Sequence, residues 1–189
     1  MAYFPLFIDL TGRRCVVVGG GPVAARKVKT LLDFGADITV LDPSPSDEVR
    51  ALSPPAILAE RTYSGPEDLT GAVLVIGAVN KPKISRRLSE DAKSLGIPVN
   101  LADAPELCTF FFPAVVRRGE LVAGISTSGG CPRLAARLRK RLETLWSPDL
   151  GEALETLKAE RNRLKACADT HEKTLRLDAI IDQAVDIVP

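Results

Sequence analysis

Residues 15–42, CVVVGGGPVAARKVKTLLDFGADITVLD, constrain the fold more strongly than any other part of the chain. They open with a short run of β-branched apolar residues at 15–18, which is typical of a parallel strand covered on both faces. A glycine turn, a helical stretch and a second apolar run at 38–41 follow without interruption. This order predicts a βαβ unit.

The turn in this unit has the pattern G-x-G-x-x-A over residues 19–24. Gly19 permits the tight turn, Gly21 lets the backbone approach a pyrophosphate, and Ala24 lets the helix pack closely on the strand. Pro22 suits a first helical turn, whose free N–H groups would face the phosphates. We therefore predict a dinucleotide site. The simpler interpretation is a glycine-rich turn that binds nothing.

An acidic residue, Asp42, ends the second strand 23 residues after Gly19. In dinucleotide-binding folds an acid near this position accepts hydrogen bonds from the adenosine ribose hydroxyls. The same carboxylate would repel a 2′-phosphate. The sequence therefore favours NAD over NADP as the cofactor.

Two later apolar runs are expected to form strands that end in small or polar residues. Ligands bind at the carboxyl ends of strands in doubly wound sheets, so Gly77, Ala78, Val79 and Asn80 are expected to border the nicotinamide. A tight strand-to-helix connection explains these four residues as well. Asp103 follows the next strand and is expected at the same sheet edge. A loop aspartate is more often a turn or capping residue, so its position alone does not assign it a function.

Strand and helical patterns alternate over residues 13–101, which predicts an α/β fold with a Rossmann-type doubly wound parallel sheet. From Phe110 the pattern changes to an antiparallel hairpin, a Ser/Gly-rich loop, a helix and a helical tail. A doubly wound sheet does not require such a hairpin. The expected domains are a Rossmann domain at 1–112, a small α+β module of hairpin plus helix at 113–147, and a helical C-terminal segment at 148–189.

Charge is distributed unevenly along the chain. Lysine and arginine total 25 against 24 aspartates and glutamates, so the whole chain gives no reason to expect nucleic acid or an anionic membrane as partner. Residues 114–146, however, hold seven basic and two acidic residues, a net charge of +5. On the helix expected there, the leucines 134, 138, 142 and 145 share a face that is expected to pack, and basic residues occupy the other faces. A solvated basic face is the simple explanation of this patch.

Targeting and metal-binding signals are weak. No apolar run approaches the roughly 20 residues of a membrane span, and the N-terminal residues lack a basic leader, so we expect no membrane partner and a cytoplasmic protein.

The four cysteines, Cys15, Cys108, Cys131 and Cys167, form no C-x-x-C pair. With a single histidine they give no recognisable zinc site, and reduced thiols are expected.

Two long segments, FPLFIDLTGRRCVVVGGGPVAARKV and NLADAPELCTFFFPAVVRRGELVAGISTSGGCPRLAARLRKRLE, carry a family resemblance. In them the chain resembles the bifunctional precorrin-2 dehydrogenase/sirohydrochlorin ferrochelatase family, which includes the N-terminal half of siroheme synthases. The resemblance implies NAD-dependent oxidation of precorrin-2 to sirohydrochlorin, a step towards siroheme. It also implies a homodimer in which the module at residues 113–147 exchanges strands between subunits.

The resemblance further implies roles for individual residues. Asp103 would be the catalytic carboxylate, since it lies in the family's D-A-P motif. Because the tetrapyrrole substrate carries many carboxylates, Arg117, Arg133 and Arg137 would bind it through charge-assisted, often bidentate hydrogen bonds. The nucleotide contacts would fall on Gly21, Pro22, Val23, Asp42, Pro43 and Ser44.

The loop S-T-S-G-G-C-P departs from the S-T-G-G-x-S-P that is more common in this family. Ser126 and Thr127 keep hydroxyl groups and are carried over as substrate-binding residues. Cys131 replaces a common serine. A small packed residue is a simpler interpretation of this thiol than an iron ligand, because metal sites need several ligands. Whether the chain also inserts ferrous iron stays open.

Two other classes of function remain possible on the sequence. One is a non-enzymatic regulatory protein that senses NAD(H) and would bind the cofactor without turnover. The other is a chelatase without redox activity. Asp42 and the G-x-G-x-x-A turn argue against the chelatase, because a protein with no use for the cofactor has no reason to keep both.

Overall fold

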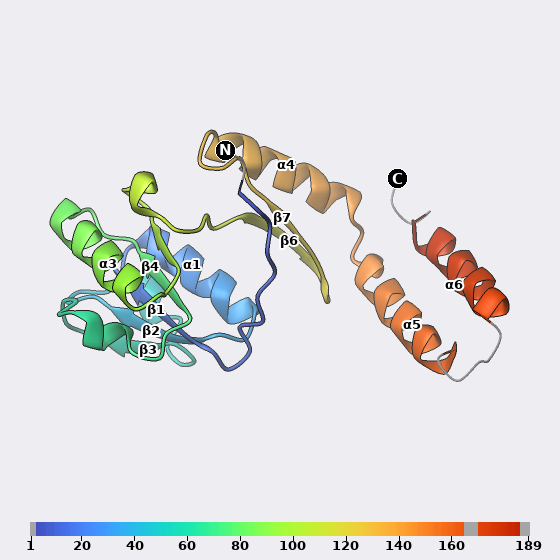
Figure 1. Ribbon diagram of the computed structural model, residues 1–189, viewed down its shortest axis with the longest axis horizontal. Coiled ribbons are helices and arrows are strands. Elements are labelled where there is room, and N and C mark those ends of the chain that lie inside the picture. Colours follow the sequence, from blue (N-terminus) through green and yellow to red (C-terminus); the bar gives the residue numbers. More distant parts are fainter. Residues whose placement is uncertain (1–2, 165–169, 186–189) are drawn as a thin grey trace. The chain divides into compact units, whose positions relative to one another are not determined.

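The computed structural model of the protein describes residues 3–164 and 170–185 (Figure 1). The chain divides into two compact units, Met1–Phe112 and Pro113–Pro189. In the first unit the elements follow in the order β1 (Arg14–Val18), α1 (Pro22–Asp33), β2 (Asp37–Leu41), α2 (Asp47–Arg50), β3 (Ile57–Ala59), η1 (Pro66–Leu69), β4 (Leu74–Gly77), α3 (Pro82–Ser94), β5 (Val99–Leu101) and η2 (Pro105–Leu107).

The first unit is built on one parallel sheet of five strands in the order β3-β2-β1-β4-β5. The chain winds outwards from β1 to β3 and then returns to place β4 on the other side of β1. This arrangement confirms the predicted Rossmann-type α/β fold. It also creates a topological switch point between β1 and β4, where such sheets bind their ligands.

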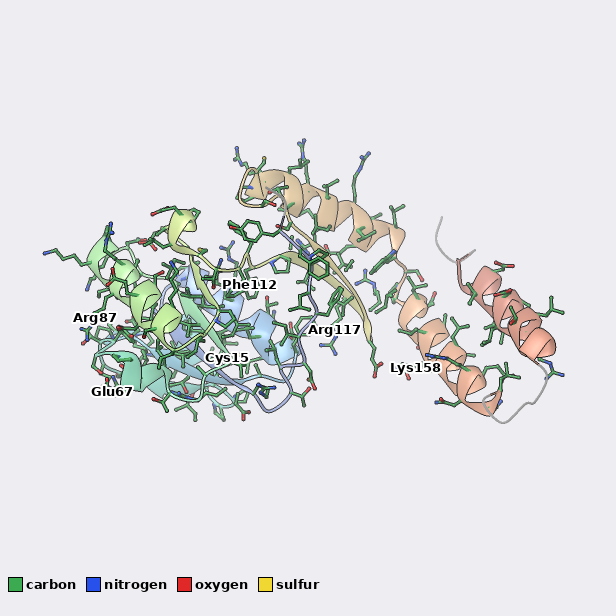
Figure 2. All side chains as sticks on the ribbon, viewed as in Figure 1. Cys15, Glu67, Arg87, Phe112, Arg117 and Lys158 are labelled. Atoms are coloured by element: carbon green, nitrogen blue, oxygen red, sulfur yellow. The ribbon has the colours of Figure 1, made fainter. Side chains whose placement is uncertain are left out.

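Helices cover both faces of the sheet, because successive strand residues point to opposite sides. Cys15, labelled in Figure 2, and Val17 pack on one face against the buried side of α1. Val16 and Val18 pack on the other face against α3 through residues such as Leu88. The continuous apolar run of β1 is thus explained by burial on both faces.

The second unit begins with an antiparallel hairpin of β6 (Ala114–Arg118) and β7 (Leu121–Ile125). It continues with the helices α4 (Pro132–Leu145), α5 (Asp149–Leu164) and α6 (Thr170–Val185). The hairpin, the helix after it and the helical tail were all expected from the sequence and are confirmed. The proposed division of this part at residue 147 stays a prediction.

The hairpin turn is joined closely to the start of α5. A Cβ added to Gly151 would lie 3.1 Å from the carbonyl carbon of Arg118, so the two backbones are in contact. Glu120 in the turn forms an ion pair with Lys158 of α5. Arg118 also donates hydrogen bonds to the carbonyls of Glu143 and Trp146 and so caps the end of α4. Hairpin, α4 and α5 therefore hold one another in place.

The leucine face of α4 is largely exposed among the described residues, contrary to the prediction that it packs. Ala135 is the buried residue of this helix, whereas Leu134 is 48% exposed and Leu138 41%. The helix contacts the hairpin, so the spacing of its leucines correctly indicates an apolar face but not what covers it. Of the helices in residues 3–164 and 170–185, none is long and apolar enough to cross a membrane.

Candidate functional site

A cavity of about 270 Å³ lies in the first unit where β1, β2 and β4 end. This is the switch point at which a doubly wound sheet binds a dinucleotide. The predicted residues Gly21, Asp42, Pro43, Ala78, Val79 and Asn80 line it. The sequence did not single out its other lining residues, which are Val18, Gly20, Leu41, Thr62, Tyr63, Lys81 and Ile84.

Gly19, the first glycine of the turn, is required because the ends of β1 and β4 pack closely against each other. Gly19 has a φ of +115°, and a Cβ placed on it would stand 2.3 Å from the carbonyl oxygen of Ala78. The N–H of Ala78 in turn donates a 2.7 Å hydrogen bond to the carbonyl of Val18. Gly19 therefore lets the loops after β1 and β4 meet beneath the cavity.

The third glycine leaves an open approach to helix α1. No atom of the described residues comes within 4 Å of a Cβ placed on Gly21. The N–H of Ala25 donates to the Gly21 carbonyl at 3.0 Å. The N–H groups of the first helical turn have no partners within the helix, and they carry its positive dipole end. This open position at a helix N-terminus fits a pyrophosphate, so the residues present suit a dinucleotide.

The loop that carries Asp42 is tied to the glycine turn. Oδ1 of Asp42 accepts a 2.8 Å hydrogen bond from the N–H of Ser44, and the N–H of Ser46 donates to the Gly20 carbonyl at 2.9 Å. Asp42 is half-buried and lines the cavity. Its carboxylate is therefore fixed beside the place where an adenosine ribose would lie.

One wall of the cavity comes from the loop after β3. The Tyr63 hydroxyl donates a 2.7 Å hydrogen bond to Asp91 of α3. Burial, followed by the bond to Asp91, raises the pKa of Tyr63 well above its usual range. The guanidinium of Arg87, labelled in Figure 2, lies 5.8 Å from the centre of the Tyr63 ring. The sequence could not indicate this wall, because the loop has no hydrophobic periodicity. Its position also depends on contacts with a helix more than 20 residues away in sequence.

A buried carboxylate anchors the same loop. Asp68 accepts two hydrogen bonds from the Arg61 guanidinium, at 2.5 and 3.0 Å, and further bonds from the N–H and hydroxyl of Ser64. The Arg61 hydrogen bonds are the main reason why the pKa of Asp68 lies far below its usual range. The wall that carries Tyr63 is thus held by charge-assisted bonds on one side and by α3 on the other.

Asp103 stands at the sheet edge predicted for it, two residues after β5. The N–H of Ala102 donates to the Gly77 carbonyl at 2.9 Å, which joins the end of β5 to the end of β4. The Asp103 side chain is exposed. Its two carboxylate oxygens lie 2.9 and 3.0 Å from the hydroxyl of Ser85 on α3. Ser85 is fully buried and carries no signal that sequence reasoning could have used.

Other predicted cofactor residues lie outside the lining of this cavity. Gly77 faces the core, since a Cβ on it would come within 2.5 Å of Leu101 and 3.0 Å of Leu88. Pro22 and Val23 form the exposed start of α1, and Ser44 follows Asp42 at the surface. Gly19 is not among the lining residues either.

A half-buried amine connects α1 to the end of the sheet. Nζ of Lys27 donates a 2.6 Å hydrogen bond to Oδ1 of Asn100 in β5 and lies 4.6 Å from the centre of the Phe112 ring. Asn100 is itself buried and donates to the carbonyl of Phe110 at 3.0 Å. Desolvation lowers the pKa of Lys27 to about 8. The structure therefore holds Lys27, which sequence reasoning missed, close to the strand that leads to Asp103.

In the second unit, the two hydroxyls predicted to bind substrate support their own loop. Ser126 accepts a hydrogen bond from the N–H of Ser128, and Thr127 accepts one from the N–H of Cys131, both at 3.1 Å. The expectation that Cys131 is a packed residue is wrong, because its side chain is exposed at the start of α4. Within the described ranges no cluster of histidine, cysteine and acidic side chains could hold a metal ion. Cys167 lies outside the described residues.

Five arginines of the hairpin and α4 divide into two groups. Arg118 caps α4 and Arg139 pairs with Glu143, so both stabilise the unit. Arg133 and Arg137 extend from the exposed surface of α4. Arg117, labelled in Figure 2, is also exposed and donates from Nε to the Gly119 carbonyl at 2.8 Å.

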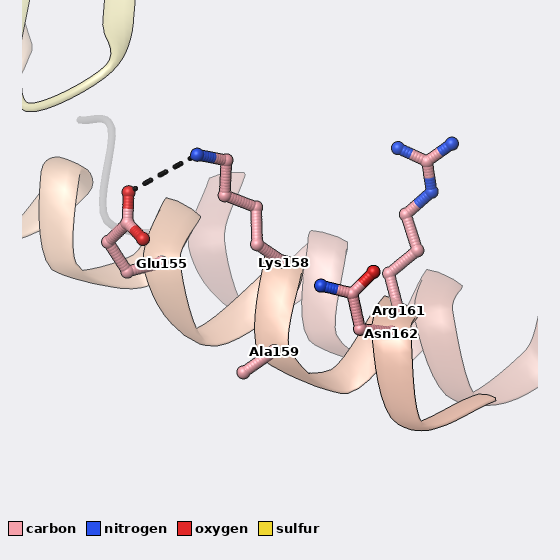
Figure 3. Close-up of a pocket in the computed structure, with 5 residues that line it drawn as sticks. All are labelled: Glu155, Lys158, Ala159, Arg161 and Asn162. Atoms are coloured by element: carbon pink, nitrogen blue, oxygen red, sulfur yellow. Dashed lines mark ion pairs between the residues drawn. The ribbon is translucent and has the colours of Figure 1, made fainter. Parts of the chain in front are cut away.

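A larger hollow, of about 490 Å³, lies on one side of α5 (Figure 3). Its walls are Glu155, Lys158, Ala159, Arg161 and Asn162. Lys158 already pairs with Glu155 at 3.5 Å, as the dashed line shows, and with Glu120. This hollow contains none of the predicted site residues, and the switch-point cavity is the better candidate despite its smaller volume.

Comparisons with known proteins agree with this geometry. Residues 6–114 match the family described as "Putative NAD(P)-binding". The chain is 39% identical over 165 residues to a siroheme synthase of Ectopseudomonas mendocina (strain ymp), with 87% of this chain covered. It is 41% identical over 169 residues to a siroheme synthase of Pseudomonas putida (strain W619), with 88% covered. In both cases the match spans 36% of the relative's length.

A solved structure titled "SirC, precorrin-2 dehydrogenase" is similar over nearly the whole chain. The TM-score is 0.74 at 27% sequence identity, and the match covers 95% of this chain and 89% of the other. The likeness therefore extends beyond the sheet and includes the second unit.

Proposed function

This chain belongs to the NAD(P)-binding family that its residues 6–114 match, and we propose that it oxidises precorrin-2 to sirohydrochlorin with NAD as the acceptor. One observation carries the proposal: the cavity at the switch point and the carboxylate of Asp103 lie at the same edge of one sheet. The similar structure is a precorrin-2 dehydrogenase and the relatives are siroheme synthases, which supports this choice of substrate.

The residues around the cavity would hold the cofactor in a defined direction. Gly21 and the start of α1, with Pro22 and Val23, would take the pyrophosphate. Asp42 would accept hydrogen bonds from the adenosine ribose and disfavour a 2′-phosphate, with Pro43 and Ser44 beside it. The nicotinamide would lie towards Val79 and Asn80. NAD, when bound, accepts a hydride from a carbon of the substrate.

Asp103 would act on the substrate directly. Oxidation of precorrin-2 removes one hydride and one proton, so that NAD⁺ and precorrin-2 give NADH, sirohydrochlorin and H⁺. A carboxylate near the reacting ring edge can accept that proton or orient the ring for hydride loss. Asp103 is exposed, at the correct sheet edge and held by a hydrogen bond, as this role requires.

We assign recognition of the substrate's carboxylates to Arg117, Arg133 and Arg137, with Ser126 and Thr127. All three arginines are exposed, and guanidinium groups bind carboxylates in bidentate geometry. Neutralising any one of the three would then raise the KM for precorrin-2 more than it lowers kcat.

We also propose a homodimer that works in the cytoplasm. Apolar side chains that this chain leaves exposed support a second copy as partner: Leu134 and Leu138 on α4, and Phe4, which is 87% exposed. Insertion of ferrous iron into sirohydrochlorin is a further activity to test. The iron would be a substrate bound by the tetrapyrrole.

The proposal is tested by mixing the purified chain with enzymatically made precorrin-2 and NAD in metal-free buffer. We expect NADH absorbance and the sirohydrochlorin spectrum to appear together, and NADP to be a poor substitute. Binding of NAD without turnover would instead indicate a regulatory protein. Iron insertion into supplied sirohydrochlorin without NAD would indicate a chelatase.

A further inference from the structure

The hydroxyl of Ser85 lies beneath the carboxylate of Asp103. We infer that Ser85 is a positioning residue, which holds that carboxylate in the orientation used for catalysis. The inference rests on the proposed function, because it concerns the group expected to meet the substrate.

The two side chains differ sharply in their freedom. Asp103 is exposed on a loop, where a carboxylate without a partner would rotate freely in water. Ser85 is fully buried on α3, and its Oγ lies 2.9 and 3.0 Å from the two oxygens of Asp103. Serine carries one hydroxyl hydrogen, so it donates to one oxygen at a time and leaves the other free to accept a proton. The carboxylate is thus fixed from the protein side and open on the solvent side.

A second buried serine shows what is particular to Ser85. Ser89 lies one turn further along α3, is 1% exposed, and donates a 2.9 Å hydrogen bond to the carbonyl of Leu107. Both serines therefore tie the segment after β5 to the same helix. The Ser89 hydroxyl, however, is hydrogen-bonded to a backbone carbonyl, whereas the Ser85 hydroxyl is hydrogen-bonded to the carboxylate proposed to be catalytic. This makes Ser89 a matched control for burial, helix position and loss of a hydroxyl.

The test compares kcat and KM for precorrin-2 with saturating NAD in the wild type, Ser85→Ala, Ser89→Ala, Asp103→Asn and the double variant Ser85→Ala/Asp103→Asn. Misorientation of the reacting group predicts that Ser85→Ala lowers kcat about tenfold or more with KM little changed. Ser89→Ala should stay within about twofold of the wild type. Because Ser85 acts through Asp103, the double variant should be no slower than Asp103→Asn alone.

Thermal unfolding and NAD affinity are measured for every variant. If Ser85→Ala does not fold, Ser85→Cys replaces it, since the thiol keeps the packing and is only a weak donor. A folded Ser85 variant with wild-type kcat overturns the inference, as does a double variant that is clearly slower than Asp103→Asn. If the wild type itself produces no NADH, the proposed function fails and the inference fails with it. Normal wild-type turnover with an equally active Ser85 variant overturns the inference alone.

Discussion

Gly19 and Ala78 are in backbone contact at the base of the cofactor cavity, where a Cβ on Gly19 would stand 2.3 Å from the Ala78 carbonyl oxygen. The contact joins the loop after β1 to the loop after β4, which flank the switch point. Gly21, two residues later, has open space around an added Cβ. We therefore expect the two glycines to have separable roles, one in the fold and one in access to the cofactor.

Gly19→Ala should destabilise the protein itself. Its methyl group would overlap backbone that cannot move aside, so we expect the free energy of unfolding to fall by about 2 kcal/mol or more in urea titrations. Gly12→Ala is the control for a positive φ without the contact, because Gly12 has a φ of +63° but, apart from its chain neighbours, no described atom within 4 Å of the added Cβ. Its free energy of unfolding should fall by only about 1 kcal/mol, because the alanine strains the backbone but meets no neighbour. If both variants lowered the free energy of unfolding equally, the contact with Ala78 would contribute nothing to stability.

Gly21→Val should weaken cofactor binding and cost only about 1 kcal/mol of stability, because Gly21 is the N-cap of α1 and valine is a poor N-cap residue. Its side chain would project into open space at the start of α1, where the pyrophosphate is expected. We expect the NAD dissociation constant from calorimetry to rise about tenfold or more, because the backbone could no longer approach the phosphates. An unchanged affinity would place the dinucleotide elsewhere.

Asp42→Ser should relax the choice between the two nicotinamide cofactors. Removing the carboxylate removes its repulsion of a 2′-phosphate, so the ratio of kcat/KM for NADP to that for NAD should rise about tenfold. Asp47→Asn, an exposed acid five residues further along, is the control and should leave the ratio as it is. If both variants kept the wild-type preference, Asp42 would not be the selecting residue.

Lys27 should make stability increase with pH in mildly alkaline solution. Its pKa is about 8 in the folded protein and about 10.4 in an unfolded chain, so between these values the unfolded chain binds more protons. The free energy of unfolding then rises with pH. One proton sets an upper limit of about 1.4 kcal/mol per pH unit, and we expect less because the amine is only partly buried. Burial also raises the pKa of the Cys15 thiol to about 11, which acts in the opposite direction.

Comparison with Lys27→Met separates these two effects, because both proteins contain Cys15. The free energy of unfolding of the wild type, relative to that of the variant, should increase between pH 8 and pH 10. Parallel pH profiles of the two proteins would mean that Lys27 keeps its ordinary pKa.

The sheet and the glycine turn were predictable because their signals are local. The apolar run of β1, the spacing of the glycines and the acid at Asp42 all lie within one βαβ unit, where each residue type has its own steric or electrostatic reason. The antiparallel hairpin was predictable for a similar reason, since Gly119 marks a short turn between two apolar runs. The boundaries were close as well, since β1 and β2 each start one residue before the predicted runs at 15–18 and 38–41.

The missed residues depend on contacts between distant parts of the chain. Tyr63 lines the cavity because its hydroxyl is held by Asp91, and Lys27 is perturbed because Asn100 and Phe112 fold against it. Neither set of partners is adjacent in sequence, so no periodicity could reveal it. The exposed leucines of α4 show the reverse case, in which the spacing correctly predicted an apolar face but the described residues leave Leu134 and Leu138 exposed.

The most direct test of the central claim is the number of NADH molecules formed for each sirohydrochlorin, measured by absorbance in metal-free buffer for the wild type and for Asp103→Asn. We expect one NADH per sirohydrochlorin from the wild type. Asp103→Asn should bind NAD with unchanged affinity and turn over about 100-fold more slowly, as expected for loss of a proton-accepting group. An Asp103→Asn variant that forms NADH at the wild-type rate, or a wild type that forms sirohydrochlorin without NADH, would contradict the account.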